Sequence, residues 1–181
     1  MIKKVFLIVL LSFAVSINLF AQKVFATKLG QIKFFSTTIT EDIDAVNNQV
    51  DCKLTDKGQV MFGLLIKGFV FENEMMQEHF NGKDYMQSDK FPKAEFKGAI
   101  TNIATVNFGK DGAYPVMATG DLVIKGISKK QSAAGLIIIE KGKIKSKCTF
   151  KIKLKDYGIT GKDIGSVISN EIQITVEARY D

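Results

Sequence analysis

The side chains that could do chemistry are few in this sequence of 181 residues: two cysteines, Cys52 and Cys148, and a single histidine, His79. A metal site built from all three would have no recognised ligand spacing. Glu78 precedes His79, but adjacent residues of a helix do not face each other as an acid–base pair must. The chain also has no nucleophile elbow and no phosphate-cradling glycine loop. We therefore predict a protein that is not an enzyme and uses no cofactor or metal. An enzyme acting on an apolar substrate remains an alternative.

The first 21 residues have the layout of a secretory signal peptide. Lys3 and Lys4 precede an apolar run, and Ala21 supplies a small residue before the predicted cleavage point at Gln22. The run is shorter than the roughly 20 apolar residues that span a bilayer. We predict an exported protein, periplasmic or secreted, whose mature chain 22–181 forms one domain with a net charge of +4. So mild an excess does not indicate a nucleic-acid binder.

Apolar and polar residues alternate over most of the mature chain, as they do in β-strands with one wet and one enclosed face. The clearest example is 143–153, where lysine or threonine alternates with an inward series. Strands are predicted at 30–37, 43–54, 59–67, 93–106, 114–126, 130–140, 143–153 and 171–180. Glycine-containing turns are predicted at 56–58, 110–112 and 140–142. Because closure removes exposed edges, this pattern predicts an all-β, lipocalin-like closed antiparallel barrel of about eight strands.

The stretch 71–98 interrupts these strands with a short helical signal between the central strands. Asn73 is a plausible N-cap, and Met75, Met76, His79 and Phe80 gather toward one side of the predicted helix. Such a helix could cap one end of the barrel, or it could simply plug the core. Both interpretations fit the pattern.

Several segments, in order, resemble the YceI-like family of polyisoprenoid-binding-like bacterial proteins. They are GFVF at 68–71, EHF at 78–80, KFPKAEFKG at 90–98, ATGDLVIKGISK at 118–129, FKIKLKDYGI at 150–159 and SNEIQI at 169–174. The resemblance implies an extended lipocalin-like barrel whose interior holds a long isoprenoid or similar amphiphile. The chain departs from the family pattern in a shortened lead-in at 23–28 and in the absence of a proline after Lys129.

The inward-facing residues are the candidate wall of a ligand cavity, and the helix is its candidate lid. The wall candidates are Phe62, Leu64, Ile66, Phe96, Leu122, Ile124, Phe150, Ile152, Ile172, Ile174 and Val176. The lid candidates are Met75, Met76, His79 and Phe80, with His79 able to donate to a polar head group. A packed core and a lined cavity give the same alternation. A structural or interaction barrel filled by its own side chains therefore remains the competing interpretation.

Two further features leave alternatives open. Cys52 and Cys148 both fall on inward faces, and export permits a disulfide, so a bonded pair and two buried free thiols are both compatible with the sequence. The lysine row at 141–155 is either a solvated wall or a surface for transient contact with an anionic membrane. No oligomeric state is predicted.

Overall fold

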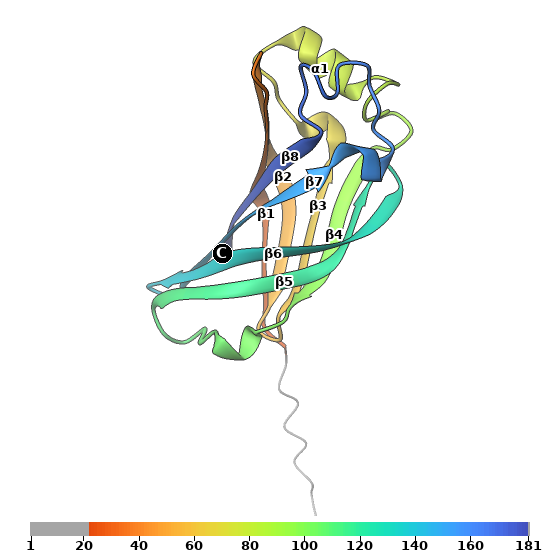
Figure 1. Cartoon of the computed structure of the whole chain (residues 1–181). Coiled ribbons are helices and arrows are strands. Elements are labelled where there is room, and N and C mark those ends of the chain that lie inside the picture. Colours follow the sequence, from red (N-terminus) through yellow and green to blue (C-terminus); the bar gives the residue numbers. More distant parts are fainter. Residues whose placement is uncertain (1–21, 181) are drawn as a thin grey trace, which may run out of the picture.

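A computed structural model describes residues 22–180, and the predicted signal peptide at 1–21 lies outside this range. Eight antiparallel strands form a closed barrel in which each strand pairs with its neighbours in sequence and β8 closes on β1 (Figure 1). The strands are β1 (Val24–Thr37), β2 (Asp42–Thr55), β3 (Gln59–Leu65), β4 (Lys93–Ile100), β5 (Gly112–Ile124), β6 (Ile127–Glu140), β7 (Lys143–Lys153) and β8 (Glu171–Tyr180). The predicted fold class is confirmed.

Several strand boundaries differ from the sequence prediction. The strand predicted at 93–106 ends at Ile100, because Asn102 donates to the Pro115 carbonyl and accepts from the Met117 amide. A side chain that hydrogen-bonds to the backbone of the neighbouring strand takes the place of a backbone partner, so strand pairing does not continue. The short 3-10 helix η2 (Ile103–Thr105) follows. β1 begins at Val24 rather than residue 30, so the shortened lead-in is part of the barrel.

The strand predicted at 59–67 ends at Leu65, since Ile66 begins the 3-10 helix η1 (Ile66–Gly68). The predicted turn at 140–142 is confirmed. Lys141 and Gly142 both have positive φ, 51° and 77°, as a two-residue hairpin requires. An equivalent turn at 125–126 lets β6 begin at Ile127 rather than at residue 130.

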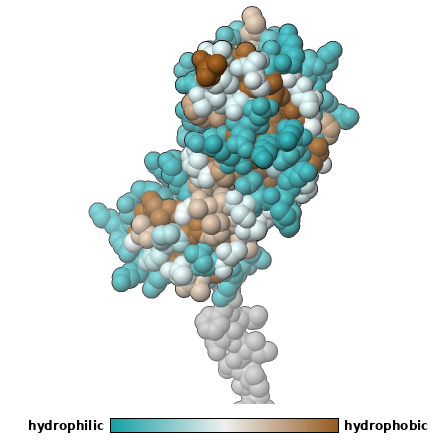
Figure 2. Space-filling view, viewed as in Figure 1, coloured by the Kyte–Doolittle hydropathy of each residue, from teal (hydrophilic) through white to brown (hydrophobic). Residues whose placement is uncertain are grey.

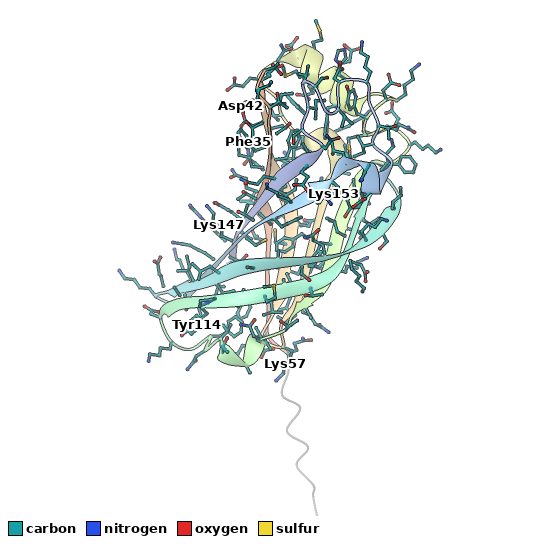
Figure 3. All side chains as sticks on the ribbon, viewed as in Figure 1. Phe35, Asp42, Lys57, Tyr114, Lys147 and Lys153 are labelled. Atoms are coloured by element: carbon teal, nitrogen blue, oxygen red, sulfur yellow. The ribbon has the colours of Figure 1, made fainter. Side chains whose placement is uncertain are left out.

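One end of the barrel, which we call the filled end, is packed with side chains. Leu54, Ile137, Ile139 and Tyr180 are between 1% and 4% exposed there. This end carries the 56–58 turn and η2, and Figure 3 marks it with Lys57 and Tyr114. Phe25 stacks on Phe108 with ring centroids 5.2 Å apart, which extends the packing below the strands.

The opposite end, which we call the capped end, lies under α1 (Glu74–Asn81) and the loops 82–92 and 158–170 (Figure 1). Asn73 is the N-cap, as predicted, because its side chain accepts from the amides of Met75 and Met76. No residue of α1 is buried, so the helix covers the barrel rather than plugging it. Within residues 22–180 no helix has the length and apolar character needed to cross a membrane.

Side-chain hydrogen bonds tie the segments of the capped end together. Thr38 and Thr40, in the turn between β1 and β2, donate to the carbonyls of Val167 and Ser166 at 3.3 and 3.2 Å. Tyr85 donates to Asp163 at 2.8 Å and so joins the 82–92 loop to the 158–170 loop. Most of the surface in Figure 2 is polar, with apolar patches that include its upper end. Ile39, which is fully exposed, belongs to this end.

Candidate ligand-binding site

The capped half of the barrel encloses a cavity of about 310 Å³. This volume is at the lower bound of ordinary ligand pockets, about 300 to 1,000 Å³. All eight strands, the helix and the 158–170 loop contribute to its lining. By contrast, the next cavity, on the side of the filled end, measures only about 40 Å³. The interior is therefore hollow in one half and nearly solid in the other.

The cavity exists because bulky side chains do not meet across this half of the barrel. Phe62, Leu64 and Phe150 face inward but are only partly buried, since part of their surface faces the open interior. Ala118 pairs directly with Ala133 between β5 and β6, and both line the cavity. Methyl groups at these two positions leave space that larger residues would occupy. Unfilled, largely apolar space of this kind suits an apolar ligand.

Four phenylalanines form one wall beneath the helix. Phe34 lies 5.4 Å from both Phe69 and Phe71, and Phe80 lies 5.0 Å from Phe71, measured between ring centroids. These spacings lie within the favourable range for aromatic pairs. Phe80 belongs to α1, so the cluster anchors the helix to β1 and to the segment after η1. The helix is thereby held over the cavity by aromatic contacts.

Few polar groups reach the cavity. Ser36 is 1% exposed and its hydroxyl oxygen accepts from the Ser169 amide at 2.9 Å. Burial, followed by the hydrogen bond to Asp163, raises the pKa of Tyr85. Glu95 reaches the lining, but its carboxylate binds Lys97 at the exposed surface. Among the described residues, no lysine or arginine lines the cavity.

A family model described as a YceI-like domain matches residues 16–180. The chain belongs to the YceI-like domain family.

Solved structures share its fold. A polyisoprenoid binding domain from Saccharophagus degradans has a TM-score of 0.74 at 10% identity and covers 87% of this chain and 97% of its own. BcnA from Burkholderia cenocepacia has a TM-score of 0.68 at 19% identity and covers 84% and 96%. The YceI protein of Campylobacter jejuni has a TM-score of 0.58 at 18% identity and covers 74% and 80%. Among curated proteins, none matches.

In this YceI-like domain, every predicted wall residue lines the cavity: Phe62, Leu64, Ile66, Phe96, Leu122, Ile124, Phe150, Ile152, Ile172, Ile174 and Val176. Met76, His79 and Phe80 line it as well, although His79 is largely exposed at its edge. Met75 does not line the cavity, although it belongs to α1, the helix over it. Its side chain is 64% exposed, because it lies on the outer side of α1. Ligand contact by these residues stays a prediction.

Other lining residues were missed by the sequence interpretation. Ile32 and Phe34 alternate within the predicted strand 30–37, so period two could have identified them. Ile159, Val167 and Ile168 come from an irregular loop, where no periodic signal exists. Their place over the cavity depends on how the loop folds back across the capped end.

The two cysteines are not bonded to each other. Cys52 is fully buried, and burial raises its pKa to about 12. Cys148 is partly buried and lines the cavity, and burial raises its pKa to about 11. Both thiols are therefore neutral at physiological pH and weakly nucleophilic. Within residues 22–180, His, Cys, Asp and Glu side chains nowhere gather in a group of three that could hold a metal ion.

Proposed function

We propose that this YceI-like domain is an exported, non-catalytic protein that holds one long-chain, isoprenoid-like lipid non-covalently for carriage or sequestration. The observation that carries this proposal is the contrast inside the barrel. Apolar side chains of the capped half surround about 310 Å³ of open space, while those of the other half pack against one another. A barrel used only as a structural element would have no reason to leave one half hollow.

Hydrophobic burial supplies enough free energy for such binding without a charged anchor. Each buried methylene contributes roughly 0.8 kcal/mol, so about a dozen buried carbons contribute on the order of 10 kcal/mol. The loss of translational and conformational freedom on binding offsets part of this. Affinity would therefore depend on the length of apolar chain that the cavity accepts.

The lining favours a ligand whose head group is uncharged. The anionic groups in the lining are Asp163, to which Tyr85 already donates, and Glu95, whose carboxylate is paired with Lys97. Among the described lining residues there is no cation to balance a phosphate or carboxylate, and burying an unpaired charge costs several kcal/mol. A hydroxyl, amide or quinone head group could instead bond to Gln131 or His79 at the edge.

Two further observations support the proposal. A solved relative is described as a polyisoprenoid binding domain. The N-terminal 21 residues have the composition of a signal peptide, which supports export with a mature chain that starts at Gln22.

The first experiment is to express the full chain in a bacterial host and collect the exported protein. Native mass spectrometry of the intact protein and mass spectrometry of its organic extract are then compared. We expect a mature chain beginning at Gln22 and one long-chain neutral lipid per protein. Empty protein that also refuses added isoprenoids would overturn lipid binding. Uncleaved protein retained in the cytoplasm would overturn export alone.

The second experiment uses a matched ligand pair. All-trans-retinol and retinoic acid share an isoprenoid chain and differ in head-group charge at neutral pH. We expect retinol to bind at least tenfold more tightly, measured by fluorescence titration. Equal affinities would contradict the neutral head group while leaving lipid binding intact.

Wall variants test where the ligand lies. Phe62→Asp and Phe150→Asp should each abolish retinol binding while circular dichroism shows a folded barrel. Thr149→Asp is the control, because Thr149 is exposed on β7 next to Phe150. Full binding by both folded wall variants would contradict this wall assignment.

A further inference from the structure

Strands β6 and β7 are neighbours in the barrel, yet they pair along only part of their length. Their register runs from Glu140 opposite Lys143 to Gly135 opposite Cys148 and then stops. Residues 127–134 of β6 pair only with β5, and residues 149–153 of β7 pair only with β8. In Figure 1 the two strands leave their shared hairpin together and separate toward the capped end.

The interval between these two unpaired edges borders the cavity. Gln131 and Ala133 on β6 line the cavity, and so do Phe150 and Ile152 on β7. If the register continued, Ala133 would face Phe150 and Gln131 would face Ile152. The residues that would pair if the sheet continued between β6 and β7 are thus the ones that line the cavity. We call this interval the β6–β7 gap.

Both ends of the β6–β7 gap are held. At the lower end, a Cβ at Gly135 would lie 2.9 Å from the Lys147 carbonyl oxygen, so the strands approach closely where pairing begins. At the upper end, Lys125 donates to the Gly158 carbonyl at 2.9 Å, just beyond the 3-10 helix η3 (Leu154–Tyr157). The gap is therefore an unpaired interval bounded at both ends rather than a frayed edge.

Other strand junctions are also incomplete, including those between β2 and β3, between β1 and β8 and between β4 and β5. Between β2 and β3, Asn47 donates to the Leu65 carbonyl and Val46 pairs with Val70, so the segment after β3 covers the interval. Between β1 and β8, most of the unpaired stretch lies beside the filled end, where Tyr180 is 4% exposed. Each of these other junctions has one cavity-lining residue on each unpaired edge: Ser36 and Ile172 between β1 and β8, Ile43 and Leu64 between β2 and β3, and Ala94 and Ile124 between β4 and β5. The β6–β7 gap has two on each edge and is therefore the longest unpaired interval along the cavity.

Charge around the β6–β7 gap is positive. Lys129 on β6 and Lys153 on β7 are exposed, and among the described residues neither has a salt-bridge partner within 4.0 Å. Elsewhere on the lysine row, Lys145 and Lys147 are paired with Glu140 and Glu177. On the edges of the gap, Lys130 and Lys151 are likewise paired, with Asp121 and Glu171. Lys129 and Lys153 therefore supply the uncompensated positive charge beside the gap.

We propose that the β6–β7 gap is the portal through which the lipid passes, and that its lysines face the anionic bilayer that supplies or receives it. This inference rests on the proposed function. The capped end offers the other route, but hydrogen bonds between its loops and the aromatic contacts of Phe80 tie its segments together. An exposed lysine close to an anionic membrane contributes attraction that salt screens.

The test bridges the gap chemically. In Ser132→Cys/Lys151→Cys, the new thiols stand on opposite edges of the gap, and a short bismaleimide joins them. The control, Leu136→Cys/Lys147→Cys, joins the same strands where they already pair. Native Cys52 and Cys148 react slowly because burial raises the pKa of each thiol. Intact mass confirms a single bridge in each protein.

We expect the bridge across the gap to slow retinol uptake from vesicles of phosphatidylcholine and phosphatidylglycerol at least tenfold. The bridge in the control should change it less than about twofold, since that part of the wall stays closed. The equilibrium affinity for retinol should be equal in the two bridged proteins, because a portal changes the rate of entry and not the binding site. Unchanged uptake in the bridged gap variant would overturn the portal.

Two more variants test which route the ligand takes and whether an anionic membrane supplies it. Tyr85→Phe removes the hydrogen bond between the capping loops. Faster uptake in that variant, unaffected by the gap bridge, would place the entrance at the capped end and overturn the proposal. Lys129→Gln/Lys153→Gln should slow uptake from anionic vesicles by about fivefold for each lysine, and leave uptake from phosphatidylcholine vesicles unchanged.

Lys57→Gln is the matched control for charge, because Lys57 is exposed at the filled end (Figure 3). If Lys57→Gln slowed uptake from anionic vesicles as much as Lys129→Gln/Lys153→Gln, the proposed contact of the gap lysines with the membrane would be overturned. Retinol that does not bind at equilibrium would instead overturn the proposed function. Retinol that binds and enters at an unaltered rate would overturn the portal alone.

Discussion

The filled end and the capped end of this barrel share one sequence pattern and differ in what their inward side chains meet. Leu54 and Leu64 show the difference, since both face inward from neighbouring strands. Leu54 is 2% exposed in the filled end, whereas Leu64 is only partly buried and lines the cavity. At the filled end, isoleucines and Tyr180 pack together and fill the interior of the barrel. At the capped end, alanines leave the interior open. Alternation thus tells which face is enclosed, and side-chain size and strand spacing decide whether that enclosure is full.

The largest expected effect comes from truncating these two leucines. Leu54→Ala should lower the free energy of unfolding by about 2 to 5 kcal/mol, because it leaves a cavity in a packed region. Leu64→Ala should cost less than half as much, since its side chain already borders open space. Urea unfolding followed by circular dichroism measures both. Equal losses would erase the distinction between the two ends.

Thiol reactivity sharpens the comparison, because Cys52 is sealed in the core and Cys148 borders the cavity. At pH 8 the raised pKa of about 11 should slow alkylation of Cys148 about a hundredfold relative to a thiol of pKa 9.0. Cys52, whose pKa is raised to about 12, should react more slowly still. Saturating retinol should protect Cys148 further and leave Cys52 unchanged. Protection of both thiols would show that the ligand reaches the filled end.

The same pKa values fix a pH dependence. Both thiols are held neutral in the folded protein, so the unfolded chain loses its protons first as pH rises past 9. Stability should be constant below that pH and should fall from about pH 9 toward 11, as followed by urea unfolding at stepped pH. Cys148→Ser should reduce this slope. An unchanged slope in both Cys148→Ser and Cys52→Ser would rule out these thiols as its source.

A large side chain placed in the cavity should fill the capped half, as side chains already fill the other half, and should weaken ligand binding. Ala133→Phe places a ring in the open space and should weaken retinol binding at least tenfold, about 1.4 kcal/mol. Ala134→Phe is the control, since Ala134 is exposed on the outer side of β6. Fluorescence titration measures affinity, and thermal unfolding checks the fold. Equal affinity in Ala133→Phe would mean that the ligand lies elsewhere.

The smallest expected effect is local. Tyr85→Phe removes one hydrogen bond to Asp163 and should cost about 0.5 to 1.5 kcal/mol. Hydrogen exchange should become severalfold faster in 158–168, and amides of the filled end should keep their protection. Uniformly faster exchange would instead show that the two ends unfold together.

Much of this architecture followed from the sequence, because strand and turn signals are local. Period two along 143–153 and 171–180 predicted which residues point inward, and the structure places them there. Asn73 predicted the start of the helix through the hydrogen bonds that an N-cap accepts. The family motifs, spread from 68 to 174, predicted the barrel.

Only the tertiary structure decided what depends on distances between strands that are remote in sequence. The hollow half, the unpaired edges of β6 and β7, and the absence of a bond between Cys52 and Cys148 are consequences of how the sheet closes. The outward side chain of Met75 has the same origin, since the orientation of a short helix is set by the aromatic wall on which Phe80 packs. Periodicity fixes the side of a strand on which a residue lies, and closure of the barrel fixes what that residue meets.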